Sequence, residues 1–124
     1  MFEINDEKKL AVLLKIFWTI KFDVPVENGI EIAGSPHVAE LYVDAYKSMI
    51  KYLKNNGKKL DAIKLQNDLS GEHQIELEAV KRYLVFSKDK LLNFDNEEKK
   101  EFVKILISPF ILSENDLEKL LDEI

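Results

Sequence analysis

The sequence predicts an all-α protein, a single-domain bundle of about six helices over residues 1–124. Three observations predict this class. Apolar side chains recur three and four residues apart along most of the chain, the period of a helix that is buried on one face. Residues that cap helices, such as Ser35 and Asp95, stand directly before these periodic stretches. The 124 residues suit one core, and no low-complexity linker divides them.

The composition excludes several classes of protein. The chain has no cysteine, which excludes disulfides, thiolate zinc sites, iron–sulfur clusters and a cysteine nucleophile. Its start is acidic, unlike a signal peptide, and lysines interrupt the most apolar run, Leu10–Phe22. A bilayer span needs about 20 apolar residues. We therefore expect a cytoplasmic protein that does not associate with membranes.

The first helix is expected over Asp6–Phe22, with Asn5 or Asp6 as its N-cap. Its apolar positions are Leu10, Leu13, Leu14, Phe17, Trp18 and Phe22. They leave little polar surface beyond Lys15 and Lys21. Such a helix is expected near the centre of the fold, with its lysines at the surface.

The next stretch, Val24–Ile32, is the one strand-like part of the sequence. A three-residue loop that ends at Gly29 would pair Val26 with Ile30 and place apolar side chains on one face. The alternative is an irregular loop. The sequence therefore predicts either one short β-hairpin near residues 24–32 or a loop.

Start and stop signals define the remaining helices. The second helix is expected over Pro36–Asn55, after the N-cap Ser35, and the third over about Lys59–Asn67. The fourth is expected from Gly71 to Ser87 or as far as Leu92. The fifth begins at the capping box Asp95–Glu98 and ends just before Ser108, and the last helix follows the N-cap Ser113. The apolar positions of the last helix are Leu117, Leu120, Leu121 and Ile124. They lie on one face.

The net charge of the chain argues against nucleic-acid binding. The chain has 18 basic and 23 acidic residues, a net charge of −5, and Arg82 is its one arginine. Nucleic-acid affinity depends on contacts between cationic side chains and phosphates. Arginine is the residue that most often forms bidentate hydrogen bonds with guanine or phosphate. Direct nucleic-acid binding is therefore not expected.

The charges are also unevenly distributed along the chain. No lysine or arginine lies between Phe22 and Tyr46, a stretch that contains the acids Asp23, Glu27, Glu31, Glu40 and Asp44. Six lysines and one acid follow, over Lys47–Lys64. One interpretation is matching of helix dipoles, with acids early and bases late. The other is an acidic face that binds a basic protein, with Tyr46 as its aromatic anchor.

The motifs of common enzymes are missing. There is no phosphate-binding loop, nucleophile elbow or dinucleotide fingerprint, and only four glycines are present to build one. His73 and Glu76 lie one helical turn apart, but metal sites in helical bundles use the order Glu-x-x-His. We expect no catalytic residue, no metal site and no cofactor. Two alternatives stay open: a helical metal-binding protein or enzyme that uses His73 and Glu76, and a regulatory module that dimerises through Leu117–Ile124.

The stretch Val24–His37, which leads into the long helix, resembles small bacterial toxin-immunity proteins of the contact-dependent growth inhibition type. These families share no diagnostic motif, so no residue role carries over. The resemblance implies a non-enzymatic, acidic, cytoplasmic protein that binds a cognate toxin, often a basic nuclease, and covers its active site. Monomers or weak homodimers are expected.

Overall fold

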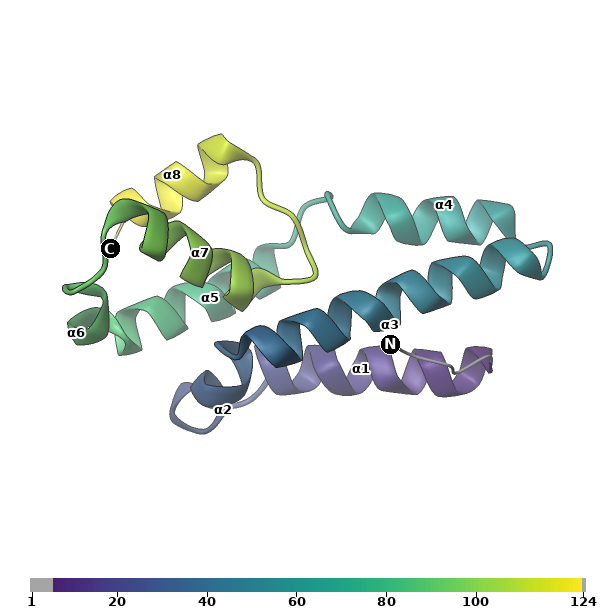
Figure 1. The fold of residues 1–124 in the computed structure, drawn as a ribbon, viewed down its shortest axis with the longest axis horizontal. Coiled ribbons are helices and arrows are strands. Elements are labelled where there is room, and N and C mark those ends of the chain that lie inside the picture. The colour runs from purple at the N-terminus through teal and green to yellow at the C-terminus, as the bar shows by residue number, and fades with distance from the viewer. Residues whose placement is uncertain (1–5, 124) are drawn as a thin grey trace.

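The structure is a computed structural model that describes residues 6–123, and this part of the chain forms eight helices and no strand. The helices are α1 (Glu7–Phe22), α2 (Val26–Ala33), α3 (Pro36–Asn55), α4 (Lys59–Asp68), α5 (Gln74–Phe86), α6 (Lys88–Leu91), α7 (Asn96–Ile107) and α8 (Glu114–Asp122). Figure 1 shows α1 and α3 side by side along an elongated molecule, with α4 at one end and α5 to α8 at the other. The predicted all-α class is confirmed, with α2 and α6 in addition to the six expected helices.

Four of the predicted helix starts are confirmed by capping hydrogen bonds, whereas α5 begins at Gln74, later than the predicted start near Gly71, and has no side-chain cap. The side chain of Asp6 accepts from two backbone N–H groups of α1, and that of Ser35 accepts from the N–H of Val38 in α3. Asp95 and Glu98 form a reciprocal capping box at the start of α7. Ser113 caps α8. These caps occupy backbone donors that would otherwise be left without partners at a helix N-terminus.

The predicted hairpin near residues 24–32 is wrong, and so is the alternative of an irregular loop, because Val26–Ala33 forms the helix α2. The apolar side chains that α2 packs against the core are Val26, Ile30 and Ala33. Gly29, expected in a turn, is buried in the middle of α2, where a Cβ would lie 2.7 Å from the hydroxyl oxygen of Tyr83. Gly29 therefore permits a close helix contact and does not mark a turn.

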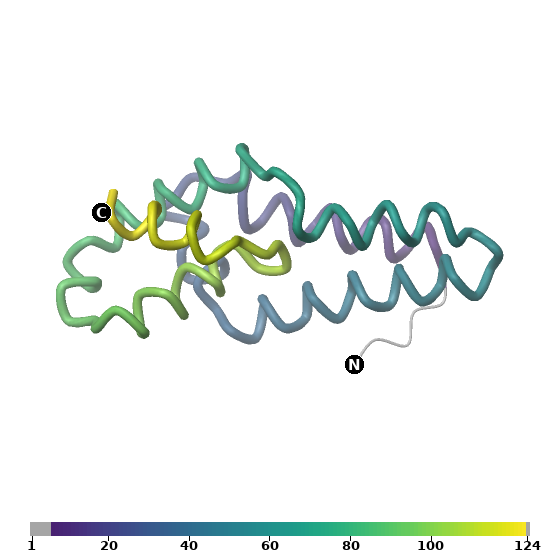
Figure 2. Tube along the Cα trace, turned by 90° about the horizontal axis from the view of Figure 1, so that it is seen from above, coloured from purple at the N-terminus to yellow at the C-terminus, as the bar shows by residue number. Residues whose placement is uncertain are grey.

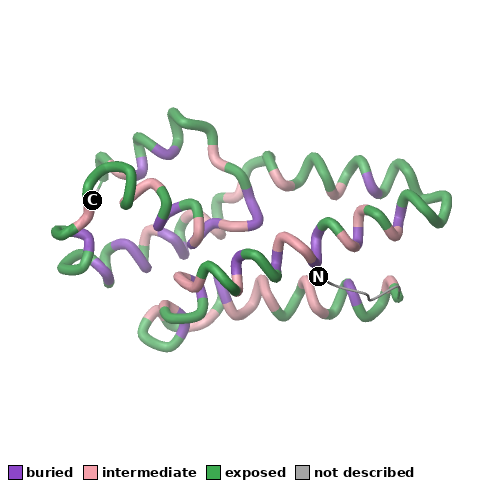
Figure 3. The backbone as a smooth tube through the Cα atoms, in the orientation of Figure 1, coloured by how far each residue is buried: buried purple, intermediate pink, exposed green. Residues whose placement is uncertain are grey.

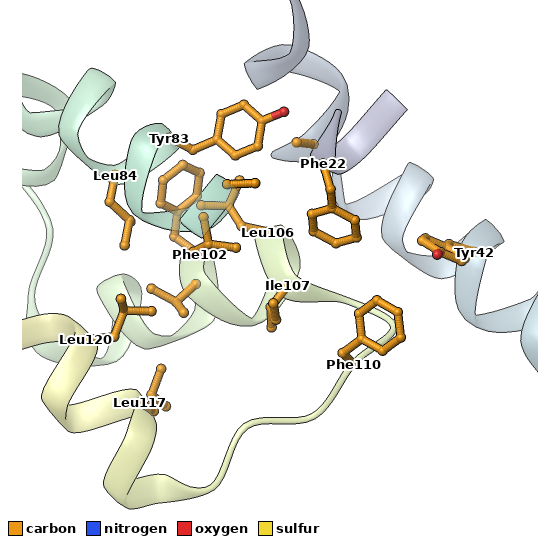
Figure 4. Close-up of a cluster of buried hydrophobic side chains, with 14 of the residues drawn as sticks. Phe22, Tyr42, Tyr83, Leu84, Phe102, Leu106, Ile107, Phe110, Leu117 and Leu120 are labelled. Atoms are coloured by element: carbon orange, nitrogen blue, oxygen red, sulfur yellow. The ribbon is translucent and has the colours of Figure 1, made fainter. Parts of the chain in front are cut away.

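The main core lies between the second half of α1 and helices α2, α3, α5, α7 and α8. Its buried side chains include Phe22, Tyr42, Tyr83, Leu84, Phe102, Leu106, Ile107, Leu117 and Leu120 (Figure 4). Phe110, from the loop between α7 and α8, has its ring centroid 6.0 Å from Phe22, 6.3 Å from Tyr42 and 6.0 Å from Tyr46. This loop residue thereby joins α1 and α3 to the C-terminal helices.

A second, smaller group of buried side chains, the distal cluster, consists of Leu10, Met49, Leu53 and Ala62. It lies where the first half of α1, the second half of α3 and α4 run beside one another, away from α5 to α8 (Figure 2). Most of α4 is exposed (Figure 3), and its Leu60 is 83% exposed. The distal cluster therefore holds α4 with few buried side chains.

Helix α1 differs from the expectation in two respects. Val12 and Ile16 are 58% and 47% exposed, so α1 has an outer face and does not lie at the centre of the fold. Lys21, expected at the surface, is fully buried. Its Nζ donates to the carbonyl oxygens of Ile105, at 2.8 Å, and Ser108, at 2.5 Å. These carbonyls belong to the C-terminal end of α7, where intrahelical donors are missing, so a side-chain donor is favourable there.

Candidate functional site

The predicted acidic face maps onto three consecutive helices. Asp23 is the C-cap residue of α1, Glu27 and Glu31 lie on α2, and Glu40 and Asp44 lie in the first half of α3. The end of α1, α2 and the start of α3 meet at one end of the molecule (Figure 1). We call these five acids the acidic surface.

Most of the acidic surface is open to a partner. Asp23, Glu27, Glu31 and Glu40 are exposed, and Asp44 is partly buried. Within residues 6–123, the carboxylates of the four exposed acids have neither an ion pair nor a hydrogen bond. Their charges are therefore not neutralised by contacts within the described part of the chain.

The helix dipole accounts for only part of this arrangement. A negative charge is favourable at a helix N-terminus and unfavourable at a C-terminus. Glu27 lies in the first turn of α2, where it is favourable, but Glu31 lies in the last turn of the same helix. Asp23 lies at the C-terminal end of α1. Two of the acids therefore occupy positions at which their charge opposes the stability of the helix.

Tyr46, expected as the aromatic anchor of this surface, is a core residue. It is 9% exposed, and its ring packs against Tyr42 and Phe110. Burial raises the pKa of Tyr46 to about 12, and the nearby Asp68 and Glu76 add to the rise. The sequence pattern missed the exposed apolar residue on α2, Ile32, because a hairpin would have turned it inward; this residue is 40% exposed.

The second candidate, His73 and Glu76, forms a compact polar array at the start of α5. The Nδ1 of His73 lies 3.9 Å from a carboxylate oxygen of Glu76, whose other oxygen accepts from the indole N–H of Trp18 at 2.8 Å. The Nε2 of His73 donates to the carbonyl of Asp68, and its ring stacks on Phe110 at 4.0 Å. Contacts within the chain thus engage Nε2 and one ring face of His73, while its Nδ1 lies near the Glu76 carboxylate without a hydrogen bond.

His73 also lines a cleft of about 480 Å³ between the start of α5 and α8. The charges in this cleft are mixed, and its Lys81 lies 3.4 Å from Glu123. In the part of the chain that the structure describes, no group of three or more His, Asp or Glu side chains could hold a metal ion. The His73–Glu76 pair is thus part of the packing between α1, α5 and the loop that carries Phe110.

The third candidate, the apolar face of the last helix, is used within the chain. Leu117 and Leu120 are 2% and 4% exposed and pack into the main core. Ile124 lies outside the described residues. The leucines expected at a dimer interface therefore attach α8 to its own chain.

Lys21 is a titratable residue that sequence reasoning did not single out. Burial lowers the pKa of Lys21 to about 7, while the carbonyls of Ile105 and Ser108 favour its charged form. Its Nζ also lies 6.0 Å from the ring centroid of Tyr42. No local signal could have found it, since its hydrogen-bond partners lie 84 and 87 residues away in the sequence.

Comparisons with known proteins do not assign a function to this chain. No family model, curated protein or solved structure matches this chain. Among residues 6–123, no helix is both long and apolar enough to cross a membrane. The function must therefore be argued from the surfaces described above.

Proposed function

We propose that this chain is a non-catalytic binding protein whose acidic surface binds a basic protein partner. In its most concrete form, the proposal is an immunity protein that neutralises a bacterial toxin, such as a basic nuclease, by covering its active site. We also propose that the protein is cytoplasmic, as expected from the sequence.

One observation carries the proposal: unpaired acids lie at helix positions where they do not stabilise the fold. Asp23 and Glu31 lie at helix C-termini, and no lysine or arginine lies between them and Tyr46. A charge pattern that opposes stability is explained by a partner that complements it. The His73–Glu76 pair supports catalysis less well, because the chain's own groups already engage it.

The mechanism follows from the electrostatics. An acidic surface attracts a positively charged partner over a distance of about one Debye length, roughly 8–10 Å at physiological salt, and so raises the association rate. At a nuclease, carboxylates would take the place of substrate phosphates in front of the cationic active-site residues. Inhibition then requires only that the surface be covered, with no chemical step.

The test starts from capture of the partner. Tagged protein is incubated with lysate of the source organism at low salt, and stoichiometric partners are eluted by raising the salt concentration. The expected result is a basic protein that is harmful when expressed alone and harmless when expressed with this chain. A captured partner that is acidic, or whose binding does not respond to salt, contradicts the proposed role of the acidic surface. A basic partner that is harmless when expressed alone contradicts the immunity form of the proposal.

A further inference from the structure

Beside the acidic surface, the chain has two shallow hollows that share one aromatic wall. The first, of about 440 Å³, lies between α2 and the α5–α6 junction, and Ile30, Glu31, Phe86 and Phe102 are among its lining residues. The second, of about 350 Å³, lies along α7 and is lined by Phe94, Glu97, Glu98, Glu101, Phe102 and Ile105. Phe102 lines both hollows, and we call the two hollows together the Phe102 groove.

The Phe102 groove is apolar at its base and acidic at its rim. Phe94 and Phe102 meet edge to face with their ring centroids 6.1 Å apart, and Phe86 is 54% exposed. The lining residues of the two hollows include five acids, which are Glu31, Asp89, Glu97, Glu98 and Glu101, but only one base, Lys90. Two of the acids also have partners within the chain: Glu98 accepts from the N–H of Asp95, and Glu101 lies 3.8 Å from Lys104.

The single base shows which chemical group the aromatic wall accommodates. The Nζ of Lys90 lies 5.2 Å from the ring centroid of Phe102 and 5.9 Å from that of Phe94. A cation within about 6 Å of a ring face is attracted by the ring's negative quadrupole. Lys90 itself is exposed, so its side chain can leave these rings without opening the core.

We propose that the Phe102 groove binds an arginine-containing basic segment of the partner, whose guanidinium group replaces the Lys90 ammonium over Phe94 and Phe102. Arginine fits this groove better than lysine because a planar guanidinium can stack on aromatic rings and at the same time form bidentate hydrogen bonds with carboxylates. Phe86 would contact the aliphatic part of the incoming side chain. Glu31 belongs to both the groove and the acidic surface, so this inference rests on the proposed function and names a specific contact within it.

The test uses a probe that does not require the natural partner. A short synthetic peptide of alternating glycine and arginine is titrated at low salt into isotope-labelled protein, and NMR shifts and affinity are measured. The same peptide with neutral citrulline in place of arginine is the control ligand. The largest shifts are expected at residues 30–34 and 86–102, and the citrulline peptide should not produce them.

Two matched lysine variants then separate the proposed contact from general electrostatics. Lys90→Ala removes a positive charge and also frees the rings, whereas Lys88→Ala removes an exposed lysine of the same helix that is not in the groove. A cation–π contact of about 0.5–1 kcal/mol corresponds to about two- to fivefold in affinity. The peptide should therefore bind Lys90→Ala about two- to fivefold more tightly than Lys88→Ala. Phe86→Ala, at a half-exposed position, should weaken binding.

Three results would overturn the inference: equal affinities for the two lysine variants, equal binding of the citrulline peptide, or shifts centred away from the groove. The proposed function fails separately. If the arginine peptide binds the groove but the captured partner is unaffected by charge reversal on the acidic surface, the groove is retained and the proposed function is wrong. If charge reversal weakens binding of the captured partner but the arginine peptide does not bind the groove, only the inference about the groove is wrong.

Discussion

The two ends of this molecule differ in both packing and charge. One end contains the main core, with Phe110 in contact with rings from α1 and α3, and it carries the acidic surface. Among residues 6–123, the buried side chains at the other end are those of the distal cluster, and this end carries the exposed lysines Lys51, Lys54, Lys58, Lys59 and Lys64. Its α1 is tied to the turn before α4 by an exposed ion pair in which Lys58 lies 2.7 Å from Glu7. The acidic surface therefore lies on the more densely packed end, and a preorganised surface loses less conformational entropy on binding.

The largest expected effect tests the difference in packing. Phe110→Ala should lower the free energy of unfolding by about 3–5 kcal/mol, because a buried ring leaves a cavity that its well-packed neighbours cannot fill. Leu53→Ala, at 6% exposure in the distal cluster, should lower it by about 2 kcal/mol, the low end of the range for leucine, because the thin cluster can relax. Urea denaturation of both variants measures these values. Equal losses would contradict the difference in packing.

The next largest effect is the pH dependence of stability caused by Lys21, which is buried in the densely packed end. Its pKa is lowered in the folded protein to about 7 from 10.5, so between these values the unfolded state binds more protons than the folded state. The free energy of unfolding should therefore rise with pH in this window, by about 1 kcal/mol per pH unit. Thermal or urea unfolding between pH 7.5 and pH 9 measures the slope.

Lys21→Met should remove most of that slope, because it removes the group that titrates. Lys15→Met is the matched control, since Lys15 is an exposed lysine on the same helix. The control should keep the slope of the unsubstituted protein. A slope that survives in Lys21→Met would mean that another group is responsible.

The outcome at α2 shows which features of the fold can be predicted from the sequence. Caps such as Ser35 and the Asp95–Glu98 box were predictable because their partners lie within three residues. The structure of residues 26–33 was not predictable, since Val26 and Ile30 fit both a hairpin and a helix, and the three-residue loop that ends at Gly29 favoured a hairpin. In the folded chain Gly29 lies against Val24 and against Tyr83 of a distant helix, and local patterning does not show the contact with Tyr83.

In the candidate site, too, some features could be predicted from the sequence and others could not. The acids could be located because the stretch between Phe22 and Tyr46 contains acids and no lysine or arginine, and charged side chains are rarely buried without a partner. The burial of Tyr46 and Lys21 could not, because it depends on Phe110 and on the end of α7, which reach these residues only in the folded chain.

The smallest expected effect concerns the helix ends at the acidic surface. Asp23→Asn and Glu31→Gln should each raise the free energy of unfolding by about 0.3–1 kcal/mol, because each removes a negative charge from a helix C-terminus. Glu27→Gln, in the first turn of α2, is the control of opposite sign and should lower it by a similar amount. Urea denaturation at low salt measures all three. If the first two variants are also destabilised, the acids do support the fold, and the observation that carries the proposed function is lost.

The most direct test of the central claim is the affinity of the captured partner for two charge-reversed variants. The first carries Glu27→Lys, Glu31→Lys and Glu40→Lys on the acidic surface. The second carries Asp61→Lys, Glu118→Lys and Asp122→Lys, three exposed acids elsewhere, including one in a helix first turn as Glu27 is. Both variants change the net charge equally, and their melting temperatures show whether they fold. The account predicts at least about tenfold weaker binding for the first variant and a much smaller change for the second. Equal weakening of both, or no weakening of the first while it stays folded, would contradict it.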